Sequence, residues 1–330
     1  MELIFIFGSL TTILGIYFFP KSKIKLNGIA WVFYSLVLYF CINSILAEIL
    51  VIFNLKADLA AFSAFYFCVS IICLFFYYRT KFVQKFVYNK ADIFFSFLIL
   101  ICSVIVALLF FKFDLNIVYE SSDPSRHFKW ALEFANDATF RIGAMNFHLV
   151  NTGLVLQIFG KIVDPFNLYK VFILCDIFYF CLYSVLFFFS LNHVATSKSK
   201  KLILFLATVL FSLGYPLNTL IFGFGYFQTG MIIITLILVI CNLFYQDLLD
   251  YKVFLLLCLT LIWGLWNSYL LFIPAVYLAI GILFLYKWPP IKRKNIRTLT
   301  SSAKISLFIP FAVSYLFFIL LPTKVDHLDS

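Results

Sequence analysis

The sequence predicts an all-α, polytopic integral membrane protein: a helical bundle of about ten transmembrane helices with an external loop that carries interfacial helices. Hydrophobic residues make up 64% of the chain and charged residues only 12%. Uncharged runs repeatedly reach the roughly 20 residues that a helix needs to cross a bilayer. These runs are continuous rather than alternating, which excludes the strand pattern of a transmembrane β-barrel.

The apolar runs define ten spans in order along the chain. The first lacks the positive flank and cleavage site of a signal peptide, so we expect it to be retained. The stretch from Lys252 to Trp288 is too long for one helix, and we divide it near Trp266; a kinked re-entrant pair is the alternative. The ten predicted spans are Leu3–Phe19, Gly28–Phe53, Leu59–Tyr78, Ile93–Phe113, Leu168–Asn192, Leu202–Leu220, Phe227–Tyr245, Val253–Tyr269, Leu270–Tyr286 and Ala303–Leu321.

Three regions follow from these spans. Residues 1–112 form an N-terminal four-helix membrane region, residues 113–167 an external loop with interfacial helices, and residues 168–330 a six-helix membrane region. Most basic residues fall in the inner loops if the N-terminus lies outside, as the positive-inside rule requires. Attraction to anionic lipid explains the net charge of +10, so no nucleic-acid partner is needed. We expect a multi-pass protein of a bacterial plasma membrane.

The eight cysteines give no sign of a metal or redox site. All of them fall inside predicted spans, and none forms a CxxC pair. They are explained as small, buried apolar side chains.

The external loop contains the stretch "YESSDPSRHFKWALEF", in which ionisable residues are concentrated. Asp123 followed by Pro124 is a typical helix start, with the aspartate as the N-cap. Phe128, Leu132 and Ala135 then recur on one face, which predicts an interfacial helix. The loop therefore begins with an amphipathic helix at the outer membrane surface.

A second external helix is predicted over Gly143–Lys161, packed near the first. If Gly143–Val163 crossed the membrane, the basic "SKSKK" loop would fall outside, so we place this segment on the membrane surface or dipping into it. Its His148 is a candidate substrate contact that would line a polar pocket with Asn151 and Thr152. Hydrogen bonding within the external cap is the alternative.

Asp123, His127 and Glu120 are the catalytic candidates. Asp123 and His127 lie one helical turn apart, so they would share a helix face and could form an acid–base pair or two metal ligands. Asp123 has an equally good structural explanation as an N-cap. A surface salt bridge with Arg126 or Lys129 is the commoner role for an acid such as Glu120. Two ligands are too few to predict a metal site, so we predict no metal and no cofactor.

External Arg126, Lys129 and Arg141 are candidates for contacts with a phosphate group. Arg141 has a simpler explanation, because with Glu133 and Asp137 it would form a solvated helix face. The basic residues of the loop therefore suit an anionic substrate without identifying one.

Within the spans, the informative polar residues are Asn43, Glu48 and Asp176. Acids inside a membrane are costly and usually face protein or water. Glu48 would either face protein or water, or snorkel to the outer surface. Asp176 could face the same cavity as Asp123. The segment Gly214–Gly230, "GYPLNTLIFGFGYFQTG", predicts an external turn broken by Gly and Pro; its position excludes a nucleotide-binding loop.

Several parts follow one another in a recognisable order between Ile93 and Leu321. A span leads into a long external loop that contains an acid, a His and an "ALEFA" helix. Next come a helix ending "LQIFGKI", a span with a basic inner loop, and the segment "FSLGYPLNTLIFGFGYFQTG". This order, with "SSDPSRHF" as its most specific motif, resembles the membrane-embedded glycosyltransferases of the C superfamily. Those enzymes take sugars from polyprenyl-phosphate carriers on the outer face, with the catalytic acid in the first large external loop. The resemblance implies that Asp123 is the general base and that His127 orients it or contacts phosphate.

The sequence thus favours a glycosyltransferase that takes a sugar from a polyprenyl-phosphate carrier on the outer face of the membrane. Its partners would be membrane lipid, the polyprenyl-phosphate-linked sugar and a glycan acceptor. A surface-polysaccharide polymerase, ligase or flippase is one alternative, and a transporter or noncatalytic membrane subunit is another. Paired Gly/Pro-interrupted helices in two matching halves, which would indicate a transporter, are not evident.

Overall fold

The computed structural model describes residues 1–18, 26–80, 86–138, 146–192, 197–246, 248–249, 251–269, 272–274, 276–278 and 280. This part of the chain is almost entirely helical, which confirms the all-α prediction. Its only strands are the two-residue β1 (Leu26–Asn27) and β2 (Phe86–Val87), which pair in parallel. The helices are α1 (Glu2–Phe18), α2 (Gly28–Ile52), α3 (Leu59–Thr80), α4 (Lys90–Phe111), α5 (Asp123–Asp137), α6 (Asn146–Phe159), the 3-10 turn η1 (Pro165–Asn167), α7 (Leu168–Leu191), α8 (Lys198–Leu213), α9 (Tyr215–Ile221), α10 (Gly225–Tyr245) and α11 (Tyr251–Ser268).

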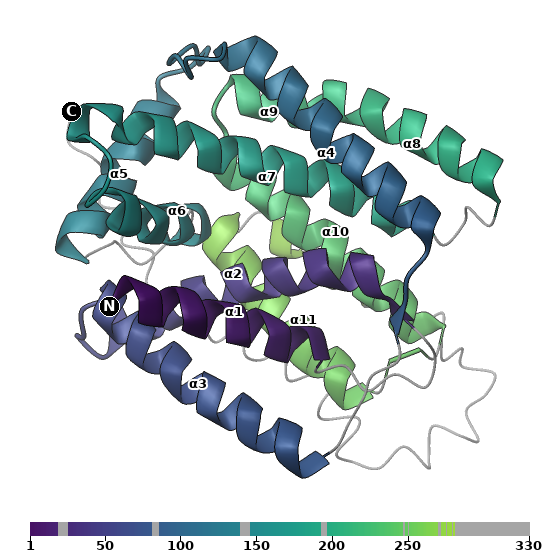
Figure 1. Cartoon of the computed structure of the whole chain (residues 1–330), viewed down its shortest axis with the longest axis horizontal. Coiled ribbons are helices and arrows are strands. Elements are labelled where there is room, and N and C mark those ends of the chain that lie inside the picture. Colours follow the sequence, from purple (N-terminus) through teal and green to yellow (C-terminus); the bar gives the residue numbers. More distant parts are fainter. Residues whose placement is uncertain are drawn as a thin grey trace.

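The long helices form one bundle (Figure 1). Helices α1 and α3 pair on one side of it and α4 and α8 on the opposite side, while α2, α7, α10 and α11 pack between them. The short helices α5 and α6 lie together at one end of the bundle. The interior is therefore built by α2, α7, α10 and α11, whose inward side chains form the largest hydrophobic cluster.

Eight of the ten predicted spans coincide with an apolar helix. Five segments are long and apolar enough to cross a membrane: Gly28–Ile52, Lys90–Phe111, Pro165–Leu191, Lys198–Ile221 and Gly225–Tyr245. Three further apolar helices are shorter, over Glu2–Phe18, Leu59–Phe75 and Lys252–Ser268. Only short pieces of the predicted ninth span are described, and the tenth lies outside the described residues. The count of ten therefore remains a prediction.

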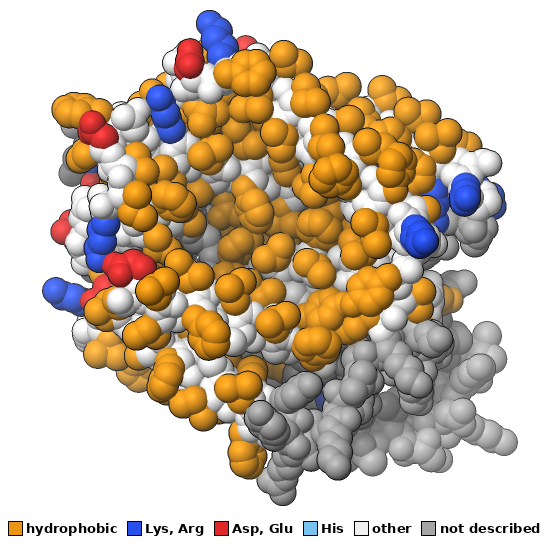
Figure 2. All heavy atoms as spheres, viewed as in Figure 1, with side chains coloured by type: hydrophobic (Ala, Val, Ile, Leu, Met, Phe, Trp, Pro, Cys, Tyr) orange, Lys and Arg blue, Asp and Glu red, His pale blue; other side chains and the backbone are white. Residues whose placement is uncertain are grey.

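The surface has the pattern of a membrane protein. Hydrophobic side chains cover most of the face shown in Figure 2, and the charged side chains gather toward the two ends of the bundle. Leu109 and Leu210 are each 71% exposed, although burial would stabilise such side chains in water. Several long apolar helices with apolar outer faces indicate a multi-pass membrane protein.

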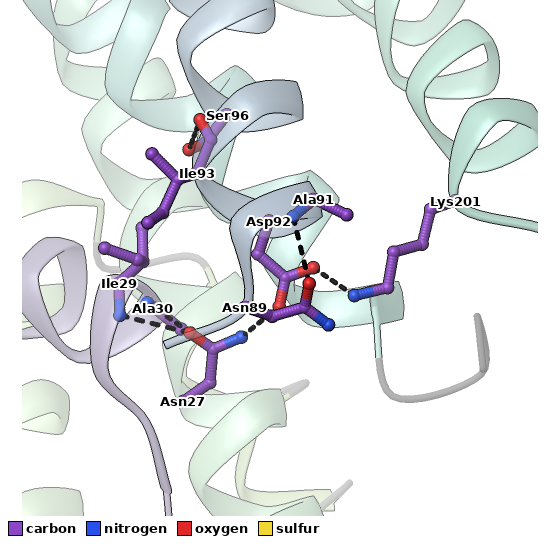
Figure 3. Close-up of polar contacts among 9 residues, drawn as sticks. All are labelled: Asn27, Ile29, Ala30, Asn89, Ala91, Asp92, Ile93, Ser96 and Lys201. Atoms are coloured by element: carbon purple, nitrogen blue, oxygen red, sulfur yellow. Dashed lines mark hydrogen bonds and ion pairs between the residues drawn. The ribbon is translucent and has the colours of Figure 1, made fainter. Parts of the chain in front are cut away.

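One end of the bundle is joined by a buried polar cluster (Figure 3). Lys201 of α8 forms an ion pair with Asp92 of α4, and both side chains are at most 9% exposed. The side-chain amide of Asn27 donates to the other carboxylate oxygen of Asp92 over 2.8 Å. The Asn27 carbonyl also accepts from the amides of Ile29 and Ala30, so it caps α2. The cluster therefore ties the starts of α2, α4 and α8 together.

The two predicted loop helices exist, and the first begins one residue earlier than expected. The N-cap of α5 is Ser122, whose side chain makes no capping bond, and Asp123 is the first helical residue. Most side chains of α6 are buried against α2, α5, α7, α10 and α11, while its position at the membrane surface remains a prediction. The polar residues that make this segment a poor lipid-facing span therefore face protein instead.

Candidate functional site

A hydrogen-bonded triad is built around a buried pair of side chains where α6 meets α7. His148 Nε2 is 2.9 Å from Oδ1 of Asp176, and each side chain is 2% exposed. The hydroxyl of Tyr119, in the loop before α5, donates to Oδ2 of Asp176 over 2.6 Å. Burial, followed by the nearby Asp176 carboxylate, raises the pKa of Tyr119 well above its ordinary value, so the phenol stays protonated. Both oxygens of the intramembrane acid are thus satisfied.

The glycine-rich turn before α10 closes over this triad. A Cβ on Gly225 would lie 2.5 Å from His148 Nε2 and 3.1 Å from Asp176 Oδ1, so only glycine permits this approach. Gly223 has a φ of +69°, and a Cβ there would lie 1.8 Å from the Pro124 ring at the start of α5. Packing against the start of α5 and against the triad explains why this turn contains "GFG".

The same turn is fixed to the loop before α5 by two hydrogen bonds. The backbone amide of Glu120 donates to the carbonyl of Ile221 over 3.0 Å, and the Ser121 hydroxyl donates to the carbonyl of Phe222 over 2.6 Å. Segments about a hundred residues apart in sequence are therefore held side by side. The resulting position of α5 determines where Asp123 and His127 lie.

His127 is the link between the triad and the surface. It is 3% exposed, its ring centroid is 6.1 Å from that of His148, and it meets Tyr226 edge-on at 5.2 Å. Burial, reinforced by His148, lowers its pKa from 6.5 to about 4, although Asp176, Asp123 and the Gly223 backbone oppose the shift. The imidazole is therefore neutral at pH 7.

Neutral His127 has one ring nitrogen available. Its Nδ1 is buried without a hydrogen-bond partner. A neutral imidazole has one nitrogen that donates and one that accepts a hydrogen bond. His127 therefore has an unused hydrogen-bonding nitrogen inside the protein.

Asp123 lies at the rim of this site, one turn before His127. Its side chain is partly exposed, and within the described chain its carboxylate has no ion-pair or hydrogen-bond partner. It is close enough to influence the charge on both His127 and Tyr226. An accessible carboxylate beside a buried neutral imidazole is an arrangement that can remove a proton from a bound hydroxyl.

The other predicted site residues lie around the rim or outside the described chain. Glu120 is exposed, and no described basic side chain pairs with it. Arg126 is exposed, whereas Lys129 lies 3.9 Å from Glu133 in a surface pair that contributes little. Arg141 is outside the described residues. No group of three or more candidate metal ligands occurs among the described side chains.

His148 and Asn151, which were expected to line one polar pocket with Thr152, hydrogen-bond different helices. Asn151 accepts from Asn43 of α2 over 2.8 Å and donates to the backbone of Phe147 and Phe40. His148 instead hydrogen-bonds Asp176 of α7. A contact between His148 and substrate therefore remains a prediction.

Sequence reasoning missed Tyr119 and Tyr226 as neighbours of the site. Tyr119 directly precedes Glu120, and Tyr226 falls within the aromatic turn, so neither stood out in a chain with 19 tyrosines. The expectation that Asp176 faces the same cavity as Asp123 remains a prediction. The suggestion that Glu48 snorkels is wrong, since its side chain is fully buried.

Comparisons of the chain with protein-family models, curated proteins and solved structures found no match.

Proposed function

We propose that the protein is a membrane glycosyltransferase that takes a sugar from a polyprenyl-phosphate carrier at the face of the membrane where α5 lies. The observation that supports this most is the position of Asp123 and His127: an accessible carboxylate next to a buried, neutral imidazole at one end of an apolar bundle. A lipid-linked substrate reaches such a position from the bilayer, and a glycan acceptor reaches it from water.

The proposed step is the transfer of one glycosyl group. Asp123 accepts the proton of the acceptor hydroxyl as its oxygen forms a bond with the anomeric carbon of the sugar. The bond between that carbon and the phosphate oxygen breaks, and the polyprenyl phosphate leaves with the electron pair. His127 lies within electrostatic reach of Asp123 and has an unused ring nitrogen, Nδ1, with which to orient the hydroxyl.

Exposed basic residues of α5 suit the leaving phosphate. Arg126 and Lys129 are exposed on this amphipathic helix, opposite the buried Pro124, Ala131 and Phe134. An interfacial helix places such side chains at the level of lipid headgroups, where a phosphate group lies. Their charge would stabilise the phosphate as it gains negative charge during transfer.

Lipid bound to the purified protein would test this proposal. We expect mass spectrometry of the detergent-purified chain to detect polyprenyl phosphate or its glycosylated form. Added polyprenyl phosphate should protect the segment 114–138 from limited proteolysis, whereas a phospholipid of equal charge should not. Recovery of ordinary phospholipid only, with no protection by the polyprenyl carrier, would contradict the proposal.

A transporter is the second candidate, and one observation favours it. Glu48 is completely buried within the membrane-spanning bundle, and no described cation pairs with it. Buried acids of this kind commonly take part in ion or proton movement. Transport of a solute by protein reconstituted in vesicles, in the absence of any transferase activity, would support this alternative.

A further inference from the structure

Glu48 forms a small polar site with α11 that the proposed transferase does not use. Its Oε2 accepts from Trp263 Nε1 over 2.5 Å and from Asn267 Nδ2 over 3.0 Å. The Glu48 and Asn267 side chains are both fully buried. This site joins α2 to α11 near their ends, in the part of the bundle next to α6.

Two oxygen atoms of this site lack a donor. Glu48 Oε1 and Asn267 Oδ1 are both buried without a hydrogen-bond partner. The Glu48 carboxyl group and the Asn267 amide group are already joined, because Asn267 Nδ2 donates to Glu48 Oε2. An unsatisfied buried acceptor costs about 1–3 kcal/mol, and an unpaired buried carboxylate costs more.

We propose that Glu48 and Asn267 form a proton-binding site in which the protein holds Glu48 as the neutral acid. A proton on Oε1 donates to Asn267 Oδ1, while Asn267 Nδ2 donates to Oε2, so that acid and amide form a cyclic pair. One proton thereby satisfies both orphan oxygens and removes the buried charge. A metal ion would need several further oxygen ligands, and among the described side chains at this site only these two oxygen atoms lack a partner.

Within the described part of the chain, no ion pair offers Glu48 another way to be neutralised. The helices that pack against α2 are α11, α6, α1, α7 and α10. None of their described Lys or Arg side chains forms an ion pair with Glu48. The described hydrogen bonds of the Glu48 side chain come from Trp263 and Asn267. The buried titratable side chains of α2 and of these neighbouring helices are therefore not among its described partners; they are Tyr17, Tyr34, Tyr39, Cys41, His148, Asp176, Tyr179, Cys181, Tyr183, Cys241 and Cys258.

Infrared difference spectroscopy of the full-length protein in detergent would test the proposal, independently of any transferase activity. At pH 7, the spectrum of wild type minus that of Glu48→Gln should contain the carbonyl band of a protonated carboxylic acid. This band should shift in D₂O. The exposed Glu120→Gln is the matched control and should instead remove the bands of an ionised carboxylate. Carboxylate bands in the Glu48→Gln difference spectrum would overturn the proposal.

Thermal unfolding gives a second readout. In Glu48→Gln the glutamine NH₂ group takes the place of the O–H of the neutral acid. This variant should therefore fold with a Tm close to that of wild type. Failure to fold would contradict the proposal that Glu48 is neutral. The native state would hold a proton that the unfolded chain releases. Wild-type stability should therefore fall as pH rises, and the stability of Glu48→Gln should change less.

Added salt tests for a sodium site at the same position. Such a site would raise the Tm of wild type in NaCl but not in choline chloride, and NaCl would not raise the Tm of Glu48→Gln. That result would overturn the proposal.

Discussion

His148 of α6 and Asp176 of α7 form a hydrogen bond of 2.9 Å inside the bundle, between side chains that are each 2% exposed. The bond connects α6, which packs on α5 at the candidate site, to α7, which is long and apolar enough to cross a membrane. Tyr119 donates to the other oxygen of Asp176. The Asp176 carboxylate therefore joins α7 to α6 and to the loop before α5.

Asp176→Asn should therefore destabilise the fold. Asparagine replaces one acceptor oxygen by an NH₂ group and removes the negative charge. Either Tyr119 or His148 must then lose its acceptor on residue 176 or reverse its role in the hydrogen bond. We expect a loss of about 1–3 kcal/mol, measured by thermal or denaturant unfolding in detergent. Glu133→Gln, an exposed acid of α5, is the control and should change stability little. Equal stability of both variants would show that the triad is not structurally important.

Protonation of His127 should destabilise the protein in acid. Its pKa is about 4 in the folded protein and 6.5 ordinarily, so the unfolded chain binds the proton first as pH falls. Stability should decrease from pH 6.5 to pH 4 by about 3 kcal/mol, because one pKa unit corresponds to about 1.4 kcal/mol. His127→Gln should flatten the stability profile over this range. The same slope in both proteins would contradict a buried, neutral His127.

Loss of Lys201 should weaken the opposite end of the bundle. Lys201→Met would leave the carboxylate of Asp92 buried without its ion pair, at a cost of roughly 3–5 kcal/mol. Lys200→Met removes a neighbouring exposed charge and serves as the control. Adding Asp92→Leu to Lys201→Met should restore part of the stability, because the unpaired charge is then gone. Unfolding temperatures that are equal for the two single variants would contradict this role.

Periodicity and hydropathy could predict most of the bundle. The runs at 28–53, 93–113 and 168–192 required helices because continuous apolar side chains fit no other membrane-spanning element. The cap of α5 was predicted one residue late, since Asp-Pro and Ser-Asp-Pro starts look alike in sequence. The burial of α6 could not be predicted, because it depends on which neighbours its polar side chains meet: Asn151 meets Asn43, and His148 meets Asp176.

The candidate site was predictable only in part. Asp123 and His127 were found because ionisable residues are conspicuous in an apolar chain. Tyr226 meets the His127 ring, and Tyr119 donates to Asp176. These two tyrosines come from segments that are held together by the backbone bond from Glu120 to Ile221 and by the close approach of Gly223 to Pro124. Such long-range pairings leave no local pattern in the sequence.

Labelling of introduced cysteines should define the orientation of the bundle. In a background without the eight native cysteines, Cys introduced at Ser125 should react with a membrane-impermeant thiol reagent in intact cells. Cys introduced at Ser199 should react only after the membrane is opened. Both serines are exposed, so reactivity reports the side of the membrane rather than burial. Labelling of both positions in intact cells would place them on one side and contradict an external site.

The central claim is that Asp123 accepts the proton of the acceptor during sugar transfer, and paired substitutions test it most directly. Membranes with wild type, Asp123→Asn or Asp123→Ala at equal protein levels would be assayed for transfer from a polyprenyl-phosphate sugar. Because Ser122 rather than Asp123 is the N-cap of α5, both variants should unfold at nearly the wild-type temperature. Both should lose activity by about 100-fold or more, the usual effect of losing a general base. Wild-type amounts of product from Asp123→Asn would contradict the claim.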